Sequence, residues 1–192
     1  TLTEEMRALL AVETPKSLDN VETHITGSVR QLCLAAQEEC RALGYAPVVL
    51  TASLSCTARE AGAFLANIAQ YHHGGGQKLA FLAGGETVVH LTGHGLGGRN
   101  QELALAAAPG IAGMSGAAVF SLGSDGTDGP TDAAGGYVDG STAQVLREQG
   151  VDIFAALKDN DSYHALEKAG GLIKTGPTGT NVNDIAALLL ES

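Results

Sequence analysis

The 192-residue chain is 44% hydrophobic and 17% charged, with a formal net charge of −10. Its regularly spaced apolar residues can fill a sizeable core, which excludes an intrinsically disordered protein, and its three scattered cysteines exclude a disulfide scaffold. Because no Lys/Arg cluster offsets the negative charge, we expect neither nucleic acid nor a membrane as a partner. Without an apolar run of about 18 residues or a basic-then-apolar leader, the protein is expected to be cytoplasmic.

The apolar periodicity predicts helices and strands that alternate along most of the chain. A short amphipathic helix carrying Met6, Leu9 and Leu10 ends before Pro15. Further helices are predicted over 28–43, 57–71, 99–108, 141–149, 153–158 and 162–168. Strands are predicted over 21–26, 46–50, 78–83, 87–92, 117–122 and 172–174, and the apolar tail 185–190 is either a helix or a strand.

This alternation indicates an α/β fold with a mixed or mostly parallel sheet and helices on both faces, in Rossmann-like layers. The strands over 78–83 and 87–92 are separated by Gly84-Gly85-Glu86, which is hairpin spacing. The polar stretch 72–77 is the best candidate for a boundary. We therefore expect two regions, 1–75 and 76–192.

A glycine-rich segment, 93–98, leads from a predicted strand into the helix that begins at Arg99. Free N–H groups and the helix dipole at such a junction favour an anion, which the guanidinium of Arg99 would also bind. The alternative is an ordinary loop in which Arg99 pairs with Glu102. Gly93, Gly95 and Gly98 also match G-x-G-x-x-G, but the acidic residue expected about 20 positions later in a dinucleotide fold is missing.

Two polar loops come later in the chain. In the first, 123–136, three aspartates lie within eight residues after an apolar strand, an arrangement that suits a hard cation such as Mg²⁺ but also a simple solvated turn. In the second, 175–184, hydroxyls and amides could hold phosphate or ribose oxygens, or merely cap the loop. The histidines lack the helical spacing of a zinc motif.

Five blocks in this order resemble the glycerate 2-kinase family, whose members are also catalogued as hydroxypyruvate reductases and whose C-terminal module is called the MOFRL domain. The blocks are GGET (84–87), GGRNQEL (97–103), DGTDGPTDAAG (125–135), NDSY (160–163) and TGPTGTNVND (175–184). Residues 20–70 resemble the preceding segment of the family more loosely. There Val29 replaces the usual Asn, and CTAR (56–59) replaces Gly-Glu-Ala-Arg.

The resemblance implies phosphorylation of D-glycerate to 2-phosphoglycerate with ATP and Mg²⁺, in a cleft between two α/β domains. Family members are about twice as long, so the chain resembles a C-terminal half, inactive by itself, with the N-terminal domain as its partner; a homodimer is left open. The alternatives are an NAD(P)-dependent hydroxypyruvate reductase and a non-catalytic ligand-binding module.

Site residues follow by position in the matching blocks. Arg99 would be the catalytic residue, clamping an anion, and Asp125 and Asp128 would serve the metal. Asp184 would brace its loop. Substrate contacts are expected from Gly97, Gly98, Asn100, Thr178, Thr180, Asn181 and Asn183.

Overall fold

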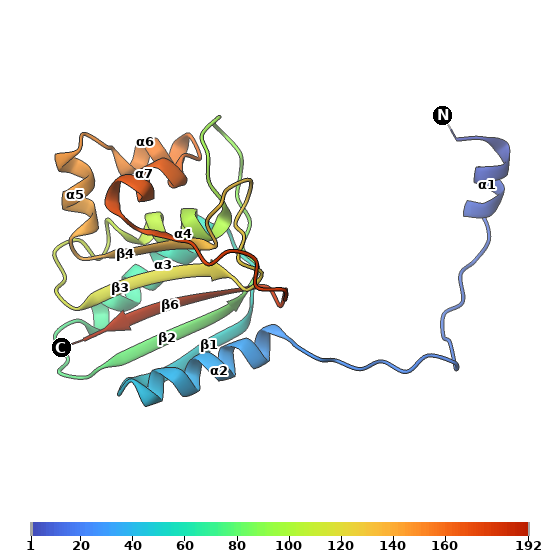
Figure 1. Ribbon diagram of the computed structural model, residues 1–192, viewed down its shortest axis with the longest axis horizontal. Helices are drawn as coiled ribbons and strands as arrows, with labels where there is room; N and C mark the ends of the chain where they lie inside the picture. Colours follow the sequence, from blue (N-terminus) through green and yellow to red (C-terminus); the bar gives the residue numbers. More distant parts are fainter. Residues whose placement is uncertain (1, 192) are drawn as a thin grey trace.

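A computed structural model describes residues 2–191, and its strands form a single sheet (Figure 1). The sheet has six strands in the order β1-β2-β6-β3-β4-β5. β1 and β2 are parallel and the remaining neighbours are antiparallel, so the mixed sheet is confirmed, with mostly antiparallel pairing. The strands are β1 (Ala46–Leu54), β2 (Leu79–Gly85), β3 (Ala117–Gly123), β4 (Gly135–Asp139), β5 (Leu172–Ile173) and β6 (Asp184–Leu190).

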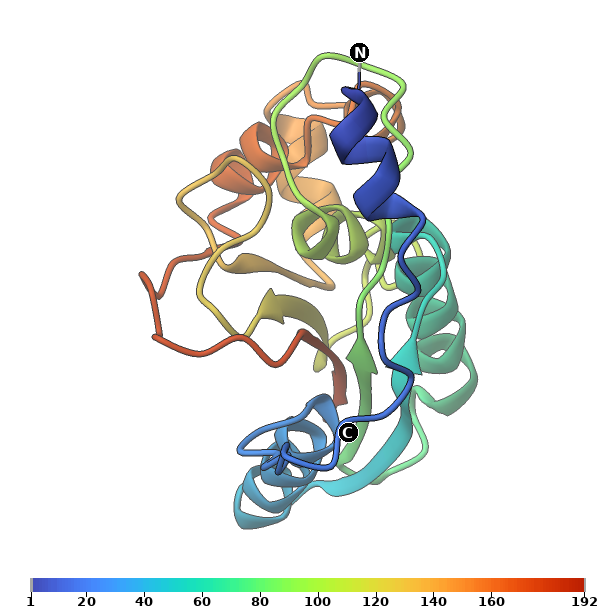
Figure 2. The ribbon, with the colours of Figure 1, turned by 90° about the vertical axis from the view of Figure 1, so that its right-hand side faces the viewer.

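Helices cover both faces of this sheet (Figures 1 and 2). One face carries α2, which packs on β1 and β2, and the other carries α3 and α4, with α5, α6 and α7 farther out. The helices of the body are α2 (Val29–Ala42), α3 (Ala58–His72), α4 (Arg99–Ala107), α5 (Thr142–Glu148), α6 (Ile153–Lys158) and α7 (Ser162–Ala169). They lie close to the predicted ranges. Within residues 2–191, no helix combines the length and hydropathy needed to cross a bilayer.

The apolar tail is strand β6, which lies between β2 and β3 at the centre of the sheet. Successive side chains of a strand point to opposite faces. Leu188 accordingly packs in the larger core with Phe81 and Val119, whereas Ala187 packs toward α2 with Leu82. Burial on both faces explains why this strand is apolar throughout and why its sequence could not distinguish a helix from a strand.

The predicted hairpin after β2 is wrong. Residues 87–92 form no strand, although Val88 makes an isolated parallel bridge to Thr57. The edge of β2 that a hairpin would use is taken by β6. Gly85 has a φ of 153° and lies so close to the backbone of Leu54 that a Cβ would overlap it, so this glycine serves the contact with β1.

The N-terminal residues 2–28 form an arm that leaves the body at the start of α2 (Figure 1). It contains α1 (Glu4–Leu10), capped by the hydroxyl of Thr3, which accepts the N–H of Met6. The strand predicted over 21–26 is wrong, because that stretch has no strand partner. Its alternation does not by itself supply the second strand that β structure requires.

The boundary predicted at residue 75 does not divide the sheet. β1, before it, pairs along its length with β2, after it. The helices α3 and α4 pack together across the same point. The polar stretch 72–77 is therefore a connection within one folded unit.

The close contact between α3 and α4 predicts that replacing a helical glycine by alanine destabilises the protein. A Cβ on Gly62 would overlap the carbonyl oxygen of Leu103, so Gly62→Ala should lower the free energy of unfolding by about 1–3 kcal/mol. Helix propensity alone would give a gain of about 1 kcal/mol. The exposed neighbour Ala63 serves as control, since Ala63→Gly should cost only about 1 kcal/mol. Urea unfolding measures both, and a stabilised Gly62→Ala variant would refute the contact.

Candidate functional site

A cavity of about 600 Å³ opens where β2 ends and α4 begins. Such a volume is in the usual range for a small-molecule site. Arg99, the first residue of α4, lies in its wall beside the segment that follows β2. The lining residues are Glu86, Thr87, Val88, Val89, Leu91, Gly93, Gly95, Gly97, Gly98, Arg99, Glu102, Gly129, Pro130, Asn160 and Ser162.

Arg99 is held by two carboxylates. Its Nε and Nη2 donate to Asp184 Oδ2 and Oδ1 at 2.5 and 3.1 Å, and its Nη1 lies 3.1 Å from Glu86 Oε1. The bond to Asp184 raises the pKa of the guanidinium above its ordinary value. The Arg99–Glu102 pair considered from the sequence is not formed, because Glu102 binds Arg59.

Asp184 is placed by the sheet. It is the first residue of β6, and its neighbours in register are Gly85 on β2 and Gly123 on β3. Glycines on both sides leave room for its side chain, which is only 8% exposed. A carboxylate this buried needs a cation, which Arg99 supplies. The sequence assigned Asp184 to bracing its own loop, whereas the structure makes it the anchor of Arg99.

The start of α4 binds an anion from within the chain. The carboxylate of Asp128 accepts the N–H groups of Asn100 and Gln101 at 3.1 and 2.9 Å, and also both side-chain amides. Burial raises the pKa of the Asp128 carboxyl, and these bonds offset part of that effect. The sequence predicted an anion at this helix N-terminus, and the anion present there is the carboxylate of Asp128 rather than a ligand.

This geometry does not agree with two predicted roles. Asp128 is 3% exposed and both of its oxygens are engaged, so it acts as a helix cap rather than a metal ligand. Asn100 is 1% exposed, and its Oδ1 accepts the hydroxyl of Ser121 at 2.6 Å. Asn100 therefore holds Asp128 and Ser121 in place beneath the site instead of facing a substrate.

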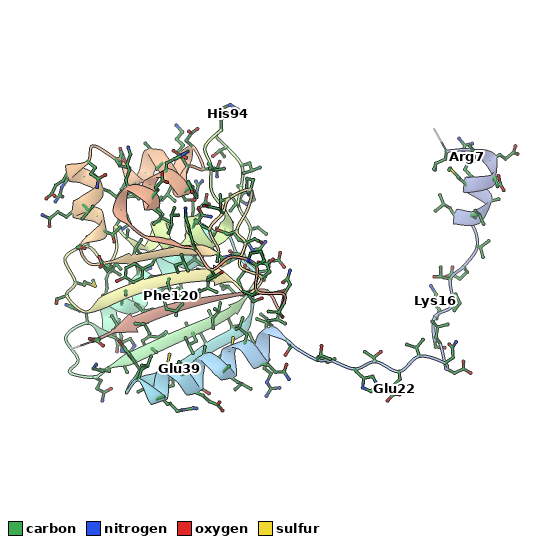
Figure 3. The ribbon with its side chains drawn as sticks, viewed as in Figure 1. Arg7, Lys16, Glu22, Glu39, His94 and Phe120 are labelled. Atoms are coloured by element: carbon green, nitrogen blue, oxygen red, sulfur yellow. The ribbon has the colours of Figure 1, made fainter. Side chains whose placement is uncertain are left out.

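The backbone of segment 93–98 packs closely against residues 159–162, which leaves no room for side chains at several of its positions. A Cβ on Gly93 or Gly95 would overlap Asp159 or Asp161. The N–H groups of residues 92–96 are also taken, by acceptors on Asp159, Asn160 and Asp161. His94 lies at the outer tip of the segment (Figure 3). The G-x-G-x-x-G match is thus a packing motif, without the open backbone that a dinucleotide needs.

Gly97 and Gly98 differ from the rest of the segment. Both line the cavity, and within residues 2–191 neither N–H donates to a protein acceptor. These two positions remain available to a ligand oxygen.

The acidic turn and the Thr/Asn loop are joined to each other by hydrogen bonds. Thr178 donates through its N–H to the backbone oxygen of Asp125 and through its hydroxyl to that of Ser124. Asn181 Nδ2 lies 3.4 Å from Asp125 Oδ2. Thr180 and Asn183 complete this loop, which leads directly into Asp184, so the predicted residues gather at one edge of the sheet.

Three side chains at the cavity were given no role from the sequence. Glu86 contacts Arg99, and the buried hydroxyl of Thr87 has no hydrogen-bond partner in the described part of the chain. Asn160, at a φ of 58°, accepts the N–H groups of residues 92 and 93 and donates to Glu102. Their signal was present, since Glu86, Thr87 and Asn160 all lie in the matching blocks.

Among residues 2–191 there is no cluster of three or more His, Cys, Asp or Glu side chains able to hold a metal ion. Mg²⁺ commonly uses one or two carboxylates together with water and substrate phosphates. Asp125, which is half-buried and has one loosely engaged oxygen, fits such a limited contribution.

Comparison with known proteins agrees with the fold and the blocks. Residues 79–184 match the model of the MOFRL family, so the chain belongs to that family. It is 51% identical to a D-glycerate 2-kinase of Thermotoga maritima and 42% identical to a glycerate 2-kinase of Pyrococcus horikoshii, over 95% and 92% of its own length. These alignments span 45% and 41% of the two relatives.

A solved structure shows that the similarity includes the fold. The crystal structure of a glycerate kinase from Thermotoga maritima superposes with a TM-score of 0.90 at 50% identity. The match covers 100% of this chain and 47% of that one. The chain therefore spans about half the length of the proteins it resembles.

The capping role of Asp128 is testable by its stability effect. Asp128→Ala would leave the N–H groups of Asn100 and Gln101 and the side-chain amide of Asn100 unpaired, and should cost about 3–5 kcal/mol in unfolding free energy. Asp152 caps α6 in the same way but is exposed, so Asp152→Ala should cost about 1 kcal/mol. Equal losses in a denaturant titration would contradict this assignment.

Proposed function

We propose that the chain is the C-terminal half of a glycerate 2-kinase, which transfers a phosphoryl group from ATP to the 2-hydroxyl of D-glycerate. The observation that carries the proposal is an arginine fixed by a buried aspartate in the wall of a ligand-sized cavity. The two relatives named above, both glycerate 2-kinases, support the choice of reaction.

Phosphoryl transfer suits these groups because it depends mainly on positioning reactants and neutralising charge on oxygen atoms. Arg99 supplies a fixed positive charge. The N–H groups of Gly97 and Gly98 and the hydroxyl of Thr87 supply further donors along the same wall. Because the whole chain is strongly negative, attraction of an anionic substrate has to come from such local groups.

The neighbouring loops complete the proposed site. Thr178, Thr180, Asn181 and Asn183 would contact substrate or nucleotide oxygens from the rim. Asp125 would hold a Mg²⁺ ion that also binds phosphate oxygens and water, and a bound Mg²⁺ would neutralise phosphate charge. Asp128 and Asn100 would position Arg99 and the glycines through the start of α4.

A preceding half of the polypeptide is the proposed partner, and the isolated chain is proposed to be inactive. The arm supports this, because its large apolar side chains are exposed, including Leu9, Leu10 and Ile25. Arg7, Lys16 and Glu22 lie on this arm, apart from the body (Figure 3). An amphipathic segment of this kind is normally covered in a folded protein.

Limited trypsin digestion tests this partner. In the isolated chain, cleavage after Arg7 and Lys16 should remove most of the arm rapidly. In the full-length polypeptide the same bonds should be cut more slowly by on the order of tenfold, because the arm is covered. The exposed Arg41 on α2 serves as an internal reference within the folded body. Equal cleavage rates at Lys16 in the two forms would rule out a covered arm.

The role of Arg99 is tested in the full-length polypeptide. Arg99→Ala should lower kcat/KM for D-glycerate by about 10²-fold or more, since a fixed charge at the reacting oxygens is lost. Arg147→Ala on the exposed surface of α5 should leave the rate unchanged. Coupled detection of ADP measures both, and a folded Arg99→Ala variant with nearly normal activity would remove Arg99 from the site.

The same assays address the alternatives. A reductase would oxidise NADH with hydroxypyruvate, whereas a binding module would take up glycerate without turnover. The glycine pattern at 93, 95 and 98 no longer supports the reductase, because these glycines pack against protein. We also propose a cytoplasmic location, which the free thiols of Cys33, Cys40 and Cys56 support.

A further inference from the structure

We propose that Glu86 occupies the place of the substrate's oxyanion on Arg99 and is displaced when that anion binds. Glu86 would thus be an internal competitor that sets the affinity of the site. The proposal rests on the proposed function for the identity of the anion, which is the carboxylate of D-glycerate or a phosphate of the nucleotide. It does not need that function for the displacement itself.

The two carboxylates hold Arg99 very differently. Asp184 accepts hydrogen bonds from two guanidinium nitrogens and is 8% exposed, whereas Glu86 approaches Nη1 at 3.1 Å and is 55% exposed. Bidentate, buried pairs are geometrically fixed, whereas exposed single contacts are weak and exchange readily with solvent or another anion. Glu86 is therefore the partner that can leave.

Charge balance favours the departure of the Glu86 side chain when an anion binds. One guanidinium between two carboxylates carries a net charge of about −1, which repels an incoming anion. When the Glu86 side chain turns outward, Arg99 and Asp184 form a neutral pair with the Nη1 side open. An oxyanion can then take the same nitrogen without facing a second negative charge.

The cavity that Glu86 and Arg99 line also contains residues with unpaired donors. Thr87 is 4% exposed and its hydroxyl lacks a partner within the described residues, and it lines the same cavity as Arg99. Gly97 and Gly98, whose N–H groups have no protein acceptor within residues 2–191, line the cavity as well. A buried donor left unpaired costs stability, so a ligand oxygen that reached the Thr87 hydroxyl would recover this cost.

Only the side chain of Glu86 has to move. Its backbone N–H donates to the carbonyl of Leu54 at 2.8 Å, and the preceding Gly85 is fixed between β1 and β6. The side chain itself is exposed and can rotate into solvent. Displacement therefore needs no rearrangement of the sheet.

Glu86→Gln in the full-length polypeptide tests the proposal. Removing the charge should lower the Kd for D-glycerate, or for inorganic phosphate as a probe of the nucleotide site, by about two- to fivefold, the range of an exposed ion contact. Isothermal titration calorimetry with each anion separately identifies which of the two replaces Glu86. Arg99→Ala should abolish the binding of that anion.

Glu191→Gln is the matched control. Glu191 is an exposed carboxylate that pairs with Lys78 at the other end of the sheet, so the same charge change there should leave both Kd values as in the wild type. Unchanged or weaker binding of both anions by a folded Glu86→Gln variant would overturn the proposal. Tighter binding without any ADP formation by the wild type would support displacement and refute the kinase, so the two failures are distinguishable.

Discussion

The ion pair between Arg99 and Asp184 is the interaction on which the rest of the site depends. It joins the first residue of α4 to the first residue of β6, which lie 85 positions apart in the sequence. Because Asp184 stands between Gly85 and Gly123 in register, the pair connects the helix to three adjacent strand ends. A buried carboxylate fixes the orientation of the guanidinium before any ligand arrives, and groups oriented in advance are those that stabilise charge most effectively.

The start of α4 shows how a protein can satisfy a helix N-terminus without a ligand. Asp128 fills the anion position at the helix N-terminus. The guanidinium of Arg99 is therefore not needed to hold an anion there, and it lies in the cavity wall. The glycines around it have the same purpose, since a Cβ on Gly98 would overlap the Asp128 carboxylate. Much of the glycine in this region thus lets polypeptide approach polypeptide. The donors left for a ligand belong to residues that line one cavity.

Local sequence patterns predicted most of the helices and the strands β1, β2, β3 and β5, but missed β4. They could not predict which strands pair, because pairing of β2 with β6 joins residues about a hundred positions apart. Because the distant partner of β2 was not evident from the sequence, Gly84-Gly85-Glu86 between two apparent strands suggested a hairpin instead. Asp128 was assigned to a metal because three nearby aspartates suggest a cation, and only the fold shows that its oxygens face Asn100 and Gln101. The matching blocks contained Glu86 and Asn160, but their contacts are tertiary.

The most direct test of this account is a crystal structure of the full-length polypeptide with D-glycerate and a non-hydrolysable ATP analogue. The account predicts a ligand oxyanion within hydrogen-bond distance of Arg99 Nη1, the bidentate pair with Asp184 retained, and the Glu86 side chain turned away. A ligand bound elsewhere, with the contact between Arg99 and Glu86 intact, would contradict it.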